Sequence, residues 1–199
     1  MAFFTSLASG QVLTGTVGND NFQLSAGSGI TILGDAGNDV VRGETAVRAE
    51  WTMAGGSDTV NLSGDLDSSR VQMGAGNDSI FVSGAISGQS VISMGDGSDT
   101  IRAASADNST ITFGNGADLF GVNAIESSTV QMGNGNDTLE IESAHNSTIG
   151  MGAGADVVNV RFDLSSVSLA LGSGTDSLSV SAIGSSTVQG GGGADTMTI

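Results

Sequence analysis

The sequence predicts an all-β protein, a parallel β-solenoid (β-roll or β-helix) of about ten coils with 19 to 21 residues each. Two observations carry this prediction: a glycine-rich turn ends on an aspartate at nearly constant intervals, and apolar residues alternate on both sides of each turn. A repeat of 19 residues is too short for a strand-helix-strand crossover. The chain can bury its strand faces by stacking each strand on its equivalent one coil later. At roughly 4.8 Å per coil, ten coils make a rod on the order of 50 Å long.

The repeated turn is represented by Gly133-Asn134-Gly135-Asn136-Asp137, and we call this Gly-x-Gly-x-Asp segment the glycine turn. The closing aspartates follow one another at intervals of 19, 19, 20, 21, 19, 19, 19, 20 and 19 residues. The first three turns are looser, because Thr16, Asp35 and Ala54 stand where later turns have their first glycine. Stacking would place the ten aspartates in one line, the aspartate column: Asp20, Asp39, Asp58, Asp78, Asp99, Asp118, Asp137, Asp156, Asp176 and Asp195.

Apolar residues on either side of the glycine turn alternate with period two, which is typical of strands with one buried face. Leu139 and Ile141 follow Asp137 at the second and fourth places, and Val130 and Met132 precede the turn. Methionine recurs at the last place before the turn. Its spacing is that of the coil, and methionine fills irregular gaps, so we interpret these residues as core packing: Met53, Met73, Met94, Met132 and Met151.

The second corner of each coil carries hydroxyl side chains, as in Asn146-Ser147-Thr148, and we call it the hydroxyl corner. We expect a hydrogen-bonded ladder there that satisfies the corner's own backbone. Residues 43–51 are more charged and predict a bulge or a small surface elaboration. We expect residues 1–15 to form an N-terminal cap and first strand, with Phe3 and Phe4 covering the open end. Residues 16–199 are then a single solenoid domain without a distinct C-terminal cap.

Charge excludes several classes of partner. With 21 acidic residues against five arginines, the formal net charge of -16 is incompatible with a simple nucleic-acid binder or with docking on an anionic membrane. No apolar run is long enough to insert into a membrane. The N-terminus lacks the pattern of a signal peptide, so we expect a bacterial protein at the cell surface or outside the cell, exported without a cleaved leader. Acids that recur at a fixed place indicate bound cations.

The segment Gly190-Gly191-Gly192-Gly193-Ala194-Asp195-Thr196-Met197 resembles the glycine-rich nonapeptide of RTX (hemolysin-type) calcium-binding proteins. The resemblance implies that Ca²⁺ sits between consecutive turns, held by aspartate carboxylates and turn carbonyls. The family's usual spacing of nine residues would put metal turns on both edges, whereas this chain predicts one row. The candidate calcium-binding residues are the aspartate column with Gly74, Gly76, Gly95, Gly97, Gly114, Gly116, Gly133, Gly135, Gly152, Gly154, Gly172, Gly174, Gly191 and Gly193.

Physical chemistry supports calcium independently of that resemblance. Calcium takes six to eight hard oxygen ligands in flexible geometry, and stacked turns offer carbonyls and carboxylates from two coils. Ten turns leave nine gaps, and nine Ca²⁺ ions would bring +18 against the net charge of -16. Folding should then depend on calcium. The alternative is that the glycine turns merely bend the chain.

Catalysis is not expected. His145 is the single histidine, which excludes a histidine cluster. The carboxylate pairs Glu140 and Glu142, and Asp65 and Asp67, are better explained as solvation of the outer face.

Three functions remain open. The first is a secreted calcium-binding structural protein, a surface-layer, matrix, adhesive or filament subunit that folds and self-associates end to end in calcium. The second is an ice- or polysaccharide-binding module, because the repeat also resembles the ice-binding region of a bacterial RTX adhesin with Gly-Thr-Gly-Asn-Asp turns. The threonine row of that region is missing, since its place holds Val17, Ala36, Ala75, Asp96, Asn115, Asn134, Ala153 and Ser173. The third is the non-catalytic RTX tail of an exported enzyme.

Overall fold

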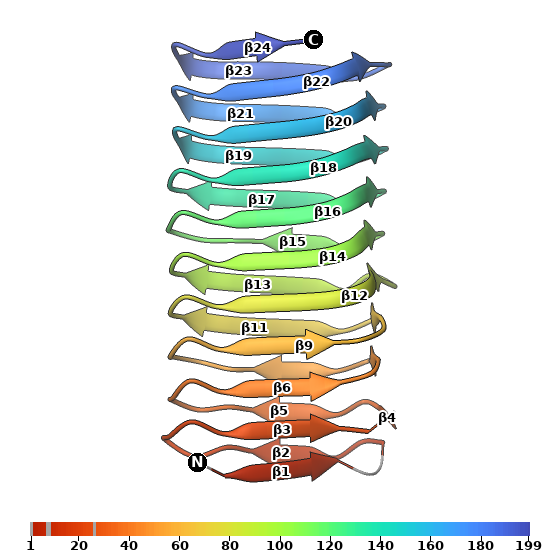
Figure 1. The fold of residues 1–199 in the computed structure, drawn as a ribbon, viewed down its shortest axis with the longest axis vertical. Helices are drawn as coiled ribbons and strands as arrows, with labels where there is room; N and C mark the ends of the chain where they lie inside the picture. The colour runs from red at the N-terminus through yellow and green to blue at the C-terminus, as the bar shows by residue number, and fades with distance from the viewer. Residues whose placement is uncertain (1, 7–8, 26) are drawn as a thin grey trace.

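The computed structural model describes residues 2–6, 9–25 and 27–199 and shows a rod of stacked coils. Two parallel sheets run along the rod, and each coil crosses from one sheet to the other and back (Figure 1). The predicted parallel β-solenoid is confirmed. Within the described ranges, no helix has the length and apolar character needed to cross a membrane.

The first sheet, which we call sheet A, holds the N-terminal strand β1 and the strands that follow the glycine turns, together with three short strands beside them. Its strands are β1 (Phe3–Ser6), β3 (Asn21–Leu24), β4 (Gly27–Ser28), β6 (Val40–Gly43), β7 (Ala46–Val47), β9 (Thr59–Leu62), β10 (Leu66–Asp67), β12 (Ser79–Ser87), β14 (Thr100–Asp107), β16 (Leu119–Glu126), β18 (Thr138–His145), β20 (Val157–Ser165), β22 (Ser177–Ile183) and β24 (Thr196–Thr198).

The second sheet, sheet B, holds the strands that precede the glycine turns. Its strands are β2 (Val12–Thr14), β5 (Thr31–Leu33), β8 (Glu50–Thr52), β11 (Arg70–Ala75), β13 (Val91–Asp96), β15 (Thr110–Thr112), β17 (Thr129–Asn134), β19 (Thr148–Gly154), β21 (Ser168–Gly174) and β23 (Thr187–Gly193).

The core lies between the two sheets and consists of like residues stacked in register. Leu139 in β18 pairs with Phe120 in β16 and with Val158 in β20, and all three are at most 1% exposed. The five methionines that precede the turns are completely buried, which confirms that they are core packing. Period-two alternation therefore decides which residues face the interior.

The hydroxyl corner forms the expected ladder. The backbone N–H of Ser109 donates to Oγ of Ser128 at 3.0 Å, and that of Ser128 donates to Oγ of Ser147 at 3.1 Å. The Ser128 hydroxyl in turn donates to the carbonyl of Glu126 at 2.7 Å. The first corner residue has a left-handed backbone, with φ of 50° at Asn146, and asparagine tolerates this conformation better than most residues.

The expected elaboration at residues 43–51 is wrong. Trp51 is 1% exposed and stacks in β8 between Ile32 and Val71, so the coil keeps its ordinary course. The charged residues of this segment that misled the prediction, such as Glu50, point outward along the alternating strand.

The two ends of the rod differ. Phe4 stacks on Phe22 with ring centroids 4.8 Å apart, whereas Phe3 is 76% exposed, so only Phe4 packs against the core as expected. Residues 1, 7 and 8 of the expected cap lie outside the described residues. At the other end, Met197 and Ile199 are exposed on and beside β24.

The looser glycine turns keep the backbone path of the later ones. Ala54 occupies the first-glycine place with φ of 76°, and Gly74 one coil later has φ of 108°. A Cβ at Gly74 would overlap the carbonyl oxygen of Ala54. Close stacking and positive φ thus both favour glycine at this place, and Ala54 adopts a conformation that side chains disfavour.

We predict that Ala54→Gly raises the free energy of unfolding by about 1 kcal/mol, because it relieves a left-handed alanine. Chemical denaturation in the presence of calcium, followed by circular dichroism, would measure the change. Ala75→Gly is the matched control: Ala75 lies in β11 with an extended backbone, so the same replacement should destabilise by about 0.5–1 kcal/mol. Equal effects at both positions would contradict the argument.

Candidate functional site

The aspartate column lies along one edge of the rod, where each glycine turn enters sheet A. Asp137, for example, immediately precedes β18. The nine aspartates from Asp20 to Asp176 are at most 2% exposed, and Asp195 in the last coil is partly exposed. The structure therefore brings together all ten predicted aspartates, and it buries most of them.

A ladder of hydrogen bonds joins these aspartates through one carboxylate oxygen. The backbone N–H of Asp118 donates to Oδ1 of Asp137, and the N–H of Asp137 donates to Oδ1 of Asp156, both at 2.9 Å. The same bond recurs at every step from Asp20 to Asp195, with lengths of 2.7–3.1 Å. Sequence reasoning missed this ladder because it assigned the whole carboxylate to metal binding. Half of each carboxylate instead completes the backbone of the preceding coil.

The other carboxylate oxygen is buried without a partner in eight coils. Among the described residues, no hydrogen bond reaches Oδ2 of Asp39, Asp58, Asp78, Asp99, Asp118, Asp137, Asp156 or Asp176. This oxygen faces its own turn: in Asp39 it lies 2.6 Å from the position that a Cβ on Gly34 would take. A buried acceptor without a partner is costly, and a buried charge more so. Each of these oxygens therefore requires a proton or a cation.

The pKa values reflect this environment. Burial, together with the neighbouring carboxylates of Asp78 and Asp39, raises the pKa of Asp58 to about 7. Burial likewise raises the pKa of Asp78, Asp118 and Asp137 to about 6. In each case the ladder hydrogen bond from the preceding coil opposes the rise.

Asp20 is an exception to the raised pKa values, and its hydrogen bonds show what the other aspartates lack. Burial acts on it as well, but hydrogen bonds from the N–H groups of Thr16 and Ala2 and from the Thr16 hydroxyl bring its pKa below the ordinary value. Thr16 occupies the first-glycine place and satisfies Oδ2 from within the protein. Where that place holds another residue, no side-chain hydroxyl reaches Oδ2 in the described structure, and only at Asp118 does the backbone N–H of this place, from Gly114, act to lower the pKa.

The donor set of this edge consists of oxygens. Among the described residues, no three histidine, cysteine, aspartate or glutamate side chains converge, so a cation site must combine a carboxylate oxygen with backbone carbonyls. The turns supply such carbonyls in close stacking: a Cβ on Gly135 would overlap the carbonyl oxygen of Gly116, and one on Gly154 would overlap that of Gly135. Hard oxygens in a flexible arrangement fit calcium and do not fit the thiolate and imidazole sites of transition metals.

The glycines predicted for the site stack as expected. Gly133 pairs with Gly152, and Gly152 pairs with Gly172, along sheet B. The second glycine of the turn has a positive φ from the second turn onward, between 127° at Gly56 and 151° at Gly154. The glycines are thus required by the close approach of consecutive turns, whatever the ligand.

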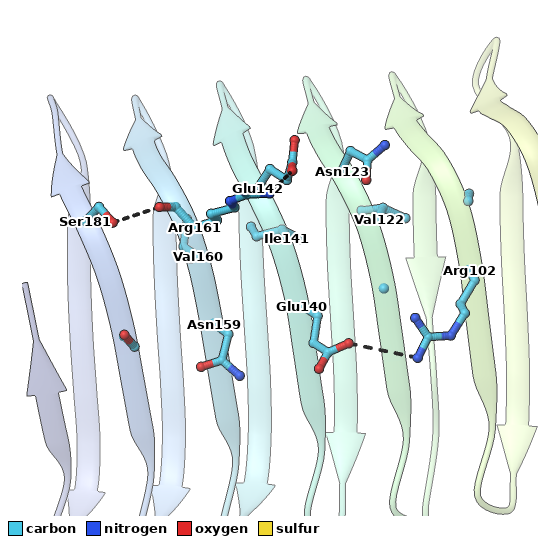
Figure 2. A pocket seen from close by; sticks show the side chains of 13 residues that line it. Arg102, Val122, Asn123, Glu140, Ile141, Glu142, Asn159, Val160, Arg161 and Ser181 are labelled. Carbon is cyan, nitrogen blue, oxygen red and sulfur yellow. Dashed lines mark hydrogen bonds and ion pairs between the residues drawn. The ribbon is translucent and has the colours of Figure 1, made fainter.

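The carboxylate pairs set aside at first lie on the surface. Glu140 approaches Arg102 at 3.9 Å, and Glu142 accepts a hydrogen bond from Arg161 at 2.9 Å on the outer face of sheet A (Figure 2). Asp65 and Asp67 accept hydrogen bonds from the next coil. His145 lies 3.3 Å from Asp163 and is partly exposed.

A second surface, the uncharged face, covers the outer side of sheet B from β15 to β23. These strands contain no charged residue, in a chain with a net charge of -16. Their first outward positions are in register and form a row of exposed hydroxyls, which comprises Thr110, Thr129, Thr148, Ser168 and Thr187. The adjoining turn residues extend it with amides, as Asn134 Nδ2 donates to Asn115 Oδ1 at 2.8 Å.

In the absence of calcium, we predict that the free energy of unfolding falls as pH rises from about 4 to about 7. The folded chain keeps protons on Asp58 up to about pH 7, whereas the unfolded chain releases them near 3.8, so higher pH favours unfolding. Urea denaturation at a series of pH values with chelator present measures this dependence.

Two charge-removing variants separate this effect from general charge repulsion. Asp58→Asn should flatten the pH dependence, because it removes the carboxylate with the highest pKa. Glu126→Gln removes the same charge from an exposed position at the opposite corner and should leave the slope unchanged. Stability that rises with pH over this range would contradict the prediction.

Comparison with known proteins supports the fold. No family model and no curated protein matches the sequence. Among solved structures, the chain is similar to the X-ray crystal structure of a hyperactive, Ca²⁺-dependent, β-helical antifreeze protein from an Antarctic bacterium. The TM-score is 0.68 and the identity 26%, over 92% of this chain and 65% of that one, so this chain spans less than two thirds of the other protein. The chain therefore shares its β-helical architecture with a calcium-dependent protein.

Proposed function

We propose that this chain is a calcium-dependent structural module, a rod whose folding requires Ca²⁺ along the aspartate column. The observation that carries the proposal is the row of eight buried Oδ2 atoms without partners. Each of these atoms would be a ligand, together with carbonyls of the stacked glycine turns. Bound calcium would neutralise the buried charge and so lower the cost of burying the carboxylates.

The unpartnered oxygens also give an expected number of calcium ions. Because Thr16 already satisfies Asp20, we expect ions at the eight coils with an unpartnered oxygen rather than in all nine gaps. The Ca²⁺ dependence printed for the similar antifreeze protein supports calcium as the metal.

A calcium-dependent rod fits a role outside the cell, as a surface, matrix or filament component of a bacterium. Extracellular calcium sites typically work at about 10⁻⁴–10⁻³ M, so such a chain would stay unfolded during export and fold afterwards. End-to-end association is part of this proposal. The parallel stacking of the coils supports it, because every coil pairs through the same strand groups and a second copy stacked in register can continue both sheets.

We predict that excess chelator abolishes most of the β structure at neutral pH and that added calcium restores it with a measurable heat of binding. Circular dichroism and titration calorimetry on the same samples test this. Complete β structure in chelator, with no heat on adding calcium, would overturn the proposal.

Variants at Asp137 separate the ladder from the ion. Asp137→Asn keeps an acceptor for the N–H of Asp118 but loses the charge, so it should weaken calcium binding and make the chelated chain more stable. Asp137→Ala loses the ladder bond as well and should cost about a further 1 kcal/mol. Glu126→Gln is the control, with the same charge change on an exposed residue. Calcium affinity unchanged in Asp137→Asn would contradict a role for this carboxylate as a ligand.

Ice binding is a second candidate function, favoured by the uncharged face. This face presents hydroxyls at a regular spacing of about 4.8 Å on a rigid sheet, and charged groups that hold their own hydration shells are absent from its strands. The similar solved structure is an antifreeze protein, which gives independent support.

If this candidate is correct, the calcium-loaded protein shows thermal hysteresis, and Thr129→Lys with Thr148→Lys removes most of it by placing charge and bulk on the row. Asn159→Lys, on the exposed outer side of sheet A, is the matched control and should leave hysteresis unchanged. Measurement with a nanolitre osmometer decides the matter, and an inactive parent protein would exclude the candidate.

A further inference from the structure

The outer side of sheet A carries a long groove that neither proposed function uses. Three hollows with volumes of about 590, 370 and 590 Å³ follow one another along the rod. The first two in chain order share Phe81 and Ser83 with each other, and the middle one shares Arg102 and Asn123 with the last. Together they form a continuous trough from Gln23 to Ser181, which we call the axial groove.

The groove arises from a bend in the sheet A strands. In β18, Ile141 and Ala144 point inward, but Glu142 and Ser143 between them both lie partly exposed, so the strand changes direction there. Pairing along the sheet shifts register at the same level, between Ile141 and Ser143. Register shifts recur at this level between β12 and β14 and between β20 and β22, so the irregularity follows the axis and crosses the strands.

The lining combines polar and apolar side chains and carries no net charge. Three of the five arginines of the chain lie here with three glutamates, whereas the chain as a whole has a net charge of -16. Figure 2 shows Arg102 and Glu140 reaching toward each other, with Arg161 beside Glu142. The axial groove is thus a neutral stretch on an acidic rod.

Gly121 deepens the groove at its centre. It lies in β16, between the strands that carry Arg102 and Glu140, and it is buried although it has no side chain. A Cβ there would lie 3.1 Å from Nη1 of Arg102, so the guanidinium lies over this glycine. The absence of a side chain leaves room under the Arg102–Glu140 pair.

We propose that the axial groove binds an unbranched, neutral polysaccharide. Sugar hydroxyls both donate and accept hydrogen bonds, which suits paired arginine and glutamate groups and the amides of Asn123 and Asn159. Phe81, 38% exposed, offers an apolar surface for a sugar ring. The strands below the groove repeat about every 4.8 Å, so a polymer lying along the axis can contact several successive coils at once.

Other partners fit this groove less well. A peptide cannot add as a strand there, because each inner strand of sheet A is paired on both sides. Nucleic acids and polyuronates are repelled by the net charge of -16, and the groove has no surplus of arginine to offset that repulsion. A neutral chain pays no such electrostatic cost.

The test uses calcium-loaded protein, with folding verified by circular dichroism, and a panel of hexasaccharides: β-1,4-glucan, β-1,3-glucan, β-1,4-mannan and α-1,4-glucan. Titration calorimetry should find binding to at least one of them, with weaker binding of the corresponding disaccharide and no binding of polygalacturonate. Arg102→Ala should weaken binding about tenfold, because it removes a charged hydrogen-bonding group. Gly121→Gln should do the same by filling the centre of the groove.

Two control variants make the same changes on the opposite sheet. Arg70→Ala and Gly150→Gln alter outward positions of β11 and β19 in sheet B, and both should leave glycan binding unchanged. No binding to any hexasaccharide of the panel would overturn the proposal. Equal losses in the groove and control variants, or preference for polygalacturonate, would overturn it as well. Neither result bears on calcium-dependent folding, which the chelation experiment tests separately.

Discussion

The burial of a row of carboxylates at one edge of the rod is the constraint on which the rest of this structure depends. Each carboxylate is held inside because its Oδ1 is the acceptor that the preceding coil's backbone N–H needs. Exposing the aspartate would leave that N–H unsatisfied, so the chain cannot relieve the charge by turning the side chain outward. The cost is concentrated on Oδ2, and the structure must meet it with a proton or a metal ion.

At both edges of the rod a side-chain oxygen accepts the backbone N–H of the preceding coil, but it belongs to a carboxylate at one edge and to a hydroxyl at the other. At the hydroxyl corner, Ser128 Oγ accepts an N–H from the earlier coil and donates its own proton to a carbonyl, so the ladder is complete within the protein. An ionised carboxylate can only accept hydrogen bonds, so the second oxygen of each aspartate needs a donor from elsewhere. Among the described residues, a side chain supplies the missing donor in the first coil alone, where it is Thr16. The hydroxyl corner thus satisfies its own hydrogen bonds, whereas the aspartate column requires protons or cations from the solvent.

Sequence alone predicts the repeat, the strands, both corners and the buried methionines, because period-two alternation and glycine spacing are local signals. It fails where the outcome depends on the neighbouring coil. The aspartate ladder joins residues 19 to 21 positions apart, and the bend that forms the axial groove is a small change of strand direction. The contact of Thr16 with Asp20 is local, but its importance appears only once the other aspartates are seen to lack such a donor. The charge around Trp51 misled the prediction because surface composition was mistaken for an irregular path.

Both ladders also give the rod a direction. In each, the donor N–H belongs to the earlier coil and the acceptor oxygen to the later one, as in Asp137 with Asp156 and in Ser109 with Ser128. At these two corners, the two faces of a coil are consequently unlike, because one face presents the donor N–H groups of the ladders and the other presents their acceptor oxygens. A joint with two-fold symmetry would oppose donors to donors, whereas a heterologous joint continues both ladders. A joint that continued both ladders would therefore belong to an open polymer with two chemically distinct ends.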